Sequence, residues 1–125
     1  MGTKFLLLGA LFGFTGVAAG AFGAHALKSR LAPDMIAVFE LAVRYQLYHA
    51  LALLALGAAM DQLQPPTNML AAWILVFGTL IFSGTLYLLS LSGARWWGMI
   101  TPIGGFALLV GWACLAWSAW ARIRG

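Results

Sequence analysis

Hydrophobic residues along the chain fall into four long runs, and three short polar stretches separate them. The runs cover about residues 5–27, 36–60, 69–91 and 102–121, and the stretches between them contain proline, glycine or charged residues. An α-helix needs roughly 20 residues to cross about 30 Å of hydrocarbon, so each run is long enough to span a bilayer. The runs are too uniformly apolar for the alternating strands of an outer-membrane barrel. The pattern predicts an all-α integral membrane bundle of four transmembrane helices in a single domain, 1–125.

The composition supports this class and excludes several others. Hydrophobic residues make up 63% of the 125 residues and charged residues only 8%, whereas soluble proteins are roughly half apolar and a quarter charged. The net charge of +4 comes from seven basic residues, most of them near the ends of apolar runs, where they can meet lipid headgroups. We therefore expect the lipid bilayer as partner and no nucleic acid. Cys114 has no second cysteine to pair with, so neither an internal disulfide nor a cysteine metal cluster is available.

The first run also has some features of a secretory signal peptide. Lys4 precedes it, and the small residues around His25 resemble a cleavage site. The run is nevertheless longer than the 7–15 residue core that is typical of such peptides. We therefore treat it as a transmembrane helix.

Glycines recur along the first run at spacings of four, three, four and three residues. This period places them on one face of a helix, as in a left-handed helix pair. Small residues on such a face let two backbones approach closely in lipid, so they predict packing within the chain or against a second copy. The last run has a sparser version of the same pattern. The predicted packing residues are Gly9, Gly13, Gly16, Gly20 and Gly23 in the first helix, and Gly104 and Gly111 in the last.

The last run is framed by recognisable signals at both ends. Thr101 is a residue type that caps helix N-termini, and Pro102 suits the first helical position. Tryptophans beside arginines, which are typical of membrane interfaces, flank both ends of the run. The sequence therefore predicts a helix that Thr101 caps and that aromatic residues anchor.

The second run carries polar and charged side chains at membrane depth. Counting back from Asp61 at about 1.5 Å per residue places His49 roughly 18 Å into the membrane and Arg44 roughly 25 Å. Glu40 then lies near the far headgroup boundary and precedes Arg44 by four residues, so the two can pair on one helix face. We expect this pair to anchor the helix, with Arg44 reaching toward the interface.

Other polar residues at this depth need hydrogen-bond partners. Tyr45 and His49 share a face of the second helix, Gln46 lies beside them, and the third run carries a polar stripe. Two antiparallel helices would bring the stripe level with these residues. Two interpretations stay open: a hydrogen-bond network that only specifies packing, or a lined cavity or ligand site. The candidate cluster comprises His25, Glu40, Arg44, Tyr45, His49, Ser83 and Tyr87.

Enzymatic and metal chemistry find little support. His25 and His49 lie at different depths, and no Cys or Glu-x-x-His pattern accompanies them, so shared ligation of a haem or metal is not expected. No phosphate-binding loop or nucleophile elbow is present. Asp34, Glu40 and Asp61 are the only acidic residues, and Asp61 lies on the opposite side of the membrane from the other two, which leaves little basis for a paired-carboxylate mechanism. We predict no catalytic residues, no metal and no cofactor.

Four stretches together carry a family resemblance over nearly the whole chain: "GAFGAHALKSRL", "YQLYHALALLAL", "SGTLYLLSLSG" and "ITPIGGFALLVGW". In this order they resemble the family catalogued as domain of unknown function 423, a group of small bacterial inner-membrane proteins. The resemblance implies a multi-pass protein of the inner (plasma) membrane. Because the family has no established activity, the resemblance assigns no role to any residue.

Three hypotheses about function follow. The first is a non-enzymatic accessory or partner-stabilising component, with a membrane-protein partner or a homo-oligomer. The second is a small transporter, channel or lipid-binding protein that uses the polar cluster around His49. The third, a redox or metal enzyme, requires bound metal or a coloured cofactor, for which the sequence offers no ligand pattern.

Overall fold

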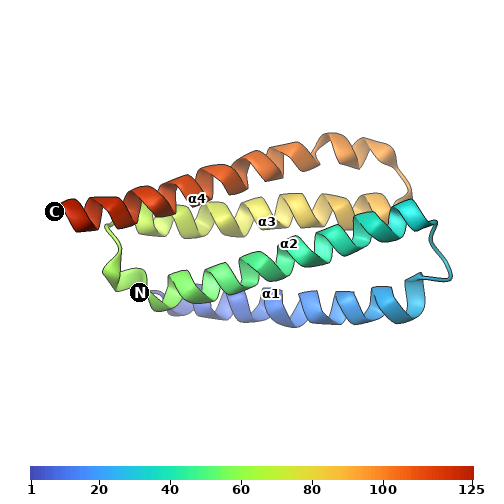
Figure 1. The fold of residues 1–125 in the computed structure, drawn as a ribbon, viewed down its shortest axis with the longest axis horizontal. Coiled ribbons are helices and arrows are strands. Elements are labelled where there is room, and N and C mark those ends of the chain that lie inside the picture. The colour runs from blue at the N-terminus through green and yellow to red at the C-terminus, as the bar shows by residue number, and fades with distance from the viewer.

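The computed structural model describes residues 1–125 as four long helices. These are α1 (Thr3–Phe22), α2 (Pro33–Ala58), α3 (Thr67–Ser92) and α4 (Thr101–Arg124), and they run side by side along the longest axis of the molecule (Figure 1). Each is long and apolar enough to cross a membrane. The prediction of an all-α bundle of four transmembrane helices is confirmed.

Short helical segments join the long helices or extend them. Gly23–Leu27 continues α1 as a π-helix, and single 3₁₀ segments, Met60–Gln62 and Arg95–Met99, lie in the second and third connections. The sequence pattern gave no sign of the wider turn of the π segment. α2 begins and ends slightly earlier than the predicted range 36–60, because Pro33 suits a first helical turn and Asp34 complements the helix dipole there.

The start of α4 corrects one expectation. Thr101 is the first residue of the helix, and Ile100 occupies the capping position without a side-chain hydrogen bond. The Thr101 hydroxyl instead shares a hydrogen bond of 2.6 Å with the Thr85 hydroxyl of α3. Because Thr101 is buried against α3, its hydroxyl joins two helices rather than capping one.

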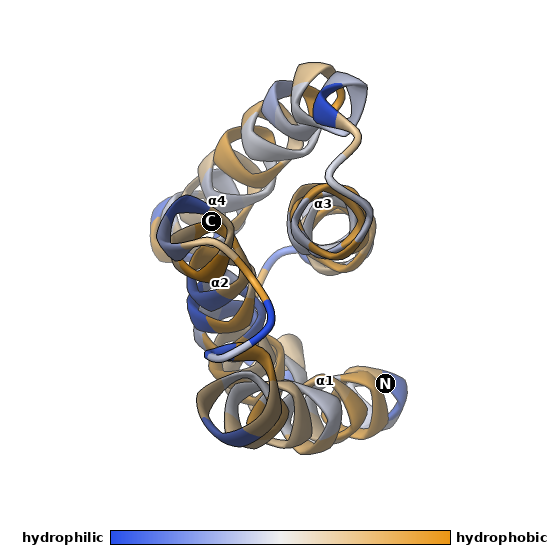
Figure 2. Cartoon of the chain, turned by 90° about the vertical axis from the view of Figure 1, so that its right-hand side faces the viewer, coloured by the Kyte–Doolittle hydropathy of each residue, from blue (hydrophilic) through white to orange (hydrophobic).

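Contacts between the helices follow the order of the chain: α1 packs on α2, α2 on α3, and α3 on α4. Seen along the bundle, α1 and α4 lie at opposite sides of the array, with α2 and α3 between them (Figure 2). The array is therefore open between α1 and α4.

Glycines allow these contacts to be close. A Cβ atom added to Gly9 would lie 2.9 Å from the Ala50 carbonyl oxygen of α2, and one added to Gly104 would lie 2.4 Å from the Phe82 nitrogen of α3. These helices therefore meet almost backbone to backbone. The other predicted packing glycines also lie against α2 or α3 side chains: Gly13, Gly16, Gly20, Gly23 and Gly111.

The hydrophobic core is concentrated at one end of the bundle. It includes Phe5, Leu53, Met60 and Leu75, all essentially inaccessible, and the Phe5 ring meets the Trp73 ring edge to face at 5.1 Å. Toward the 28–34 connection only a small cluster is buried: Leu27, Phe39 and Val43. α1 and α3 are thus held together near the N-terminus and are less tightly packed toward the other end.

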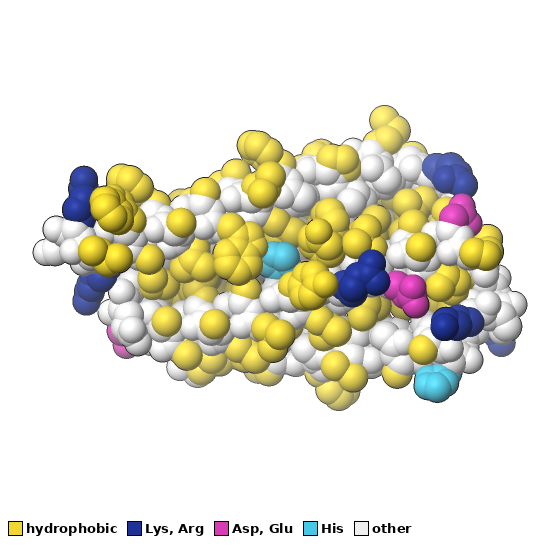
Figure 3. All heavy atoms as spheres, in the orientation of Figure 1, with side chains coloured by type: hydrophobic (Ala, Val, Ile, Leu, Met, Phe, Trp, Pro, Cys, Tyr) yellow, Lys and Arg dark blue, Asp and Glu magenta, His cyan; other side chains and the backbone are white.

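Charged side chains gather mainly at the two ends of the molecule, and hydrophobic side chains cover most of the surface between them (Figure 3). This is the distribution that a bilayer selects, because charges are costly in hydrocarbon and favourable at headgroups. The one ion pair in the structure joins Arg95 and Asp34 at 3.6 Å, and both side chains are well exposed. It links the start of α2 to the connection before α4.

Candidate functional site

Gln46 of α2 is the centre of a hydrogen-bond network that joins three helices. Its Nε2 group donates to the Phe12 carbonyl oxygen at 2.9 Å and to the Thr15 hydroxyl at 2.7 Å, both in α1. The Tyr87 hydroxyl of α3 donates to Gln46 Oε1 at 2.7 Å. Gln46 is only 8% exposed, and at such a position an amide without partners would be costly.

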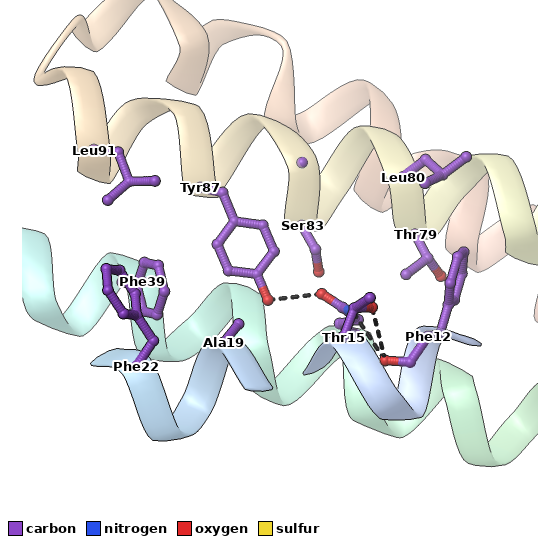
Figure 4. A pocket seen from close by; sticks show the side chains of 12 residues that line it. Phe12, Thr15, Ala19, Phe22, Phe39, Thr79, Leu80, Ser83, Tyr87 and Leu91 are labelled. Atoms are coloured by element: carbon purple, nitrogen blue, oxygen red, sulfur yellow. Dashed lines mark hydrogen bonds between the residues drawn. The ribbon is translucent and has the colours of Figure 1, made fainter. Parts of the chain in front are cut away.

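This network forms part of the lining of a groove of about 460 Å³ between α1, α2 and α3. Phe22, Phe39 and Leu91 lie at one end of the groove and Phe12 and Leu80 at the other (Figure 4). Its lining is mostly apolar carbon with a few polar groups, which is typical of sites for hydrophobic ligands. The complete lining is Phe12, Thr15, Ala19, Phe22, Phe39, Gln46, Thr79, Leu80, Ser83, Gly84, Tyr87 and Leu91.

Hydroxyl groups of the lining have partners in the protein. Ser83 donates across to the Ala42 carbonyl oxygen of α2 at 2.8 Å. Thr79 donates within its own helix to the Leu75 carbonyl oxygen at 2.7 Å. No buried side-chain nitrogen or oxygen atom lacks a partner. The lining therefore presents mainly rings and methyl groups to an occupant.

Gly84 widens the groove near the middle of its α3 lining, which runs from Thr79 to Leu91. A Cβ atom added there would meet nothing within 4 Å, in contrast to those at Gly78 and Gly104, which would meet neighbouring atoms at 3.0 Å and 2.4 Å. Helix packing therefore does not require glycine at position 84. The effect of the missing side chain is to leave space between α3 and α1.

His49 lies in a different environment from the groove. Its Nδ1–H donates to the Tyr45 carbonyl oxygen at 2.8 Å, and its Nε2 accepts a hydrogen bond of 3.0 Å from the Trp112 indole of α4. The proton is assigned to Nδ1 because a carbonyl only accepts and an indole N–H only donates. His49 is 4% exposed, and both of its ring nitrogens are engaged.

This arrangement corrects the expectation that hydroxyls of the third helix satisfy His49. Tyr45 packs its ring against Phe82 at 4.6 Å, and His49 turns toward α4. The sequence could not show that α4 reaches α2, since hydropathy alone does not order helices in space. The polar residues of α3 also differ in their hydrogen-bond partners. Ser83 and Tyr87 bond to α2, while Thr79 and Ser90 bond to carbonyl oxygens within α3.

Glu40 and Arg44 do not form the expected ion pair. Both side chains are exposed on the outer side of α2, and neither is part of the single ion pair in the structure. They line a separate hollow of about 290 Å³, together with Gly20, Gly23, Phe39 and Val43.

His25 is exposed within the π-helical segment that follows α1. It is not among the residues that line the groove or the hollow. The seven candidate residues therefore lie in four places. Ser83 and Tyr87 line the groove, and Tyr45 and His49 lie on the side of α2 that packs against α3 and α4. Glu40 and Arg44 lie on the outer side of α2, and His25 lies before the 28–34 connection. No group of three or more His, Cys, Asp or Glu side chains is placed to hold a metal ion.

Sequence reasoning left Gln46, Thr15 and Trp112 out of the candidate set. Gln46 could have been included, because an amide in the middle of an apolar run must find partners in the protein. Thr15 and Trp112 give weaker signals, since a threonine can bond within its own helix and a tryptophan within an apolar run can be an ordinary packing residue.

Comparison with known proteins gives the family. A family model described as "Protein of unknown function (DUF423)" matches residues 19–105. The chain belongs to the DUF423 family. The matched region includes all of α2 and α3, the last residues of α1 and the first residues of α4, and the predicted resemblance is confirmed.

Several relatives cover most of the chain. A UPF0382 membrane protein of Staphylococcus saprophyticus is 45% identical over 111 residues, which are 89% of this chain and 92% of the relative. The UPF0382 inner membrane protein YgdD of Escherichia coli K12 is 39% identical over 116 residues, or 92% of this chain and 88% of the relative. No solved structure matches the chain. This DUF423 member is a multi-pass inner-membrane protein, and these names assign it no activity.

Proposed function

We propose that the protein is a non-enzymatic component of the inner membrane that binds the hydrophobic tail of a lipid or similar amphiphile. The groove between α1, α2 and α3 is the observation that carries this proposal. It is mostly apolar, it lies within the spanning helices, and Gly84 leaves its centre unfilled. The groove hydroxyls of Thr79 and Ser83 donate to backbone carbonyls. This suits a binding role, because binding a hydrophobic tail needs no reacting group.

The shape of the groove suits a chain-like occupant. From Phe12 to Phe22 the groove follows α1 for about 15 Å at 1.5 Å per residue. Its volume of about 460 Å³ lies within the usual range of small-molecule sites. An elongated, mostly apolar groove of this size suits an acyl or prenyl chain.

The same geometry supports binding rather than conduction. The lining ends at Phe12 and Thr79, about halfway along α1 and α3, and beyond it the Phe5 and Trp73 rings bring the two helices together. His49, on which a transport or channel role would rest, bonds to Tyr45 and Trp112 and does not line the groove. A partner-stabilising role remains a second candidate, supported by the outer side of α2.

Photolabelling with a lipid that carries a diazirine in its acyl chain tests this proposal. In native membranes we expect the label to concentrate on α1 between Phe12 and Phe22 and on α3 between Leu80 and Leu91. Gly84→Trp should reduce this labelling severalfold, because the indole would occupy the centre of the groove.

Gly98→Trp is the matched control. It makes the same change outside the groove, where an added Cβ would meet only the flexible Leu89 side chain at 3.6 Å, and it should leave the labelling of α1 and α3 unchanged. Equal labelling of the Gly84→Trp and Gly98→Trp proteins, both correctly inserted, would contradict the proposal.

A further inference from the structure

The exposed surface of α2 is a single narrow stripe. Beyond Asp34, every exposed residue of this helix recurs at a spacing of three or four positions, so all of them lie on one side. The rest of the helix is covered by α1, by α3 and, at His49, by Trp112 of α4. The α2 stripe comprises Ala37, Glu40, Arg44, Tyr48, Leu51, Ala55 and Ala58.

The α2 stripe is unlike the lipid-facing surfaces of the neighbouring helices. The outer sides of α1 and α4 carry large apolar side chains such as Phe14, Phe106 and Leu109, each at least 69% exposed. The α2 stripe instead combines three alanines, two charges and a tyrosine, and Leu51 is its only large aliphatic residue. Small residues with a few polar ones are typical of contacts between helices in membranes, whereas bulky apolar residues suit acyl chains.

Two charges of opposite sign lie on this stripe within the membrane-spanning length of α2. At 1.5 Å per residue Glu40 lies about 9 Å and Arg44 about 15 Å along α2 from Asp34, on a helix that covers roughly 40 Å up to Asp61. A hydrocarbon layer of about 30 Å centred on this length places Arg44 inside it and Glu40 near its edge. Charged side chains within a membrane are normally paired, yet neither side chain forms an ion pair within the chain.

We propose that two copies of the chain associate through the α2 stripe, with Glu40 of each copy pairing with Arg44 of the other. Two chains inserted in the same direction can be related by a two-fold axis along the membrane normal, so one self-complementary surface serves both. Helical side chains lean toward the N-terminus, which brings the Arg44 guanidinium to the level of Glu40 in the second copy. The charge pattern is therefore complementary to itself.

The shape of the surface also suits this contact. An acidic and a basic side chain lie next to each other within the largely hydrophobic face that shows α2 (Figure 3). The hollow of about 290 Å³ that they line together with Gly20 and Gly23 provides room for the arginine of the second copy. Ala55 and Ala58 let the two α2 helices approach closely at the other end of the stripe.

Cysteine crosslinking in native membranes tests the proposal. In a Cys114→Ser background, Leu51→Cys and Ala55→Cys should each give a crosslinked dimer, because both positions face the two-fold axis. Leu109→Cys on the outer side of α4, which is 70% exposed, should give none.

Charge variants of the Ala55→Cys protein identify the pairing. Arg44→Gln removes both reciprocal ion pairs and should lower the association constant, followed by the crosslinked fraction at several protein-to-lipid ratios, about tenfold, equivalent to about 1.4 kcal/mol of association free energy. Glu40→Gln should do the same. The double variant Glu40→Arg/Arg44→Glu restores opposite charges across the axis and should recover the crosslinked fraction of the parent.

A monomeric protein in all these variants would overturn the proposal. A dimer whose crosslinked fraction is unchanged by both Glu40→Gln and Arg44→Gln would also overturn it. So would a monomer that copurifies with a phospholipid, if the Arg44→Gln protein loses that phospholipid. These results are separate from those for the groove, whose α2 lining is Phe39 and Gln46, so either proposal can fail while the other holds.

Discussion

Gln46 shows how a single amide can fix the positions of three membrane helices. Its side chain accepts from Tyr87 and donates to Thr15 and to the Phe12 carbonyl oxygen, and the groove is built around it. In water such bonds compete with solvent, but within the bilayer the alternative is an unsatisfied group or another protein partner. The network therefore sets the distance between α1 and α3 at the depth of the groove.

At this scale we expect Gln46→Leu to lower the free energy of unfolding by about 1–2 kcal/mol, since three interhelical hydrogen bonds average about 0.6 kcal/mol each. Tyr87→Phe removes only one of these bonds and should cost about 0.6 kcal/mol. Reversible unfolding in mixed micelles of increasing SDS fraction measures both values. A Gln46→Leu protein as stable as the parent would show that the network contributes nothing.

The sequence identified some residues of the site and missed others for a physical reason. Ser83 and Tyr87 belong to a polar stripe that periodicity makes visible, and both reach α2. Gln46 is an isolated amide in an apolar run, and periodicity gives it no special weight. His49 was correctly expected to need a partner, but the choice between α3 and α4 depends on helix placement, which one-dimensional patterns do not contain.

At the scale of elements, glycine positions show which helix surfaces meet and which remain apart. Gly104 allows α4 to contact the backbone of α3, where the nearest atom is the Phe82 nitrogen. Gly84, on α3 itself, lines the groove, and a Cβ atom added there would meet nothing within 4 Å. The same residue type thus serves a packed contact in one place and an unfilled space in another.

These two glycines give a matched pair of alanine variants. Gly104→Ala should destabilise the protein by about 1–3 kcal/mol, the usual range for overpacking, because the backbone of Phe82 cannot move aside as a flexible side chain could. Gly84→Ala should be neutral or stabilising by up to about 1 kcal/mol, since alanine is the better helix former. SDS unfolding compares the pair. An equal loss of stability in both variants would contradict this account of the packing.

Element boundaries were partly accessible from the sequence. The four spans follow from run length and hydropathy alone, because a bilayer of fixed thickness demands helices of this length. Details at the ends depended on tertiary contacts: Thr101 bonds to Thr85 instead of capping α4, and Gly23–Leu27 widens into a π turn. Such features require knowledge of the neighbouring helix.

At the scale of the whole molecule, the uneven core explains where a ligand can enter. Large side chains fill the end that holds Phe5, Met60 and Leu75, while few are buried near the 28–34 connection. Hydropathy could not reveal this difference, since lipid-facing and core-facing residues are equally apolar in a membrane protein. The open groove is therefore a property of the assembled bundle rather than of any one segment.

A crystal structure of the protein grown in lipid tests the central claim most directly. We predict elongated density of a single hydrocarbon chain between α1 and α3, in contact with Phe12, Gly84 and Leu91. The structure of the Gly84→Trp protein should show the indole in its place. If α1 instead packs directly on α3 in the parent protein, with Gly84 against an α1 side chain and no chain between the helices, the groove is not a binding site.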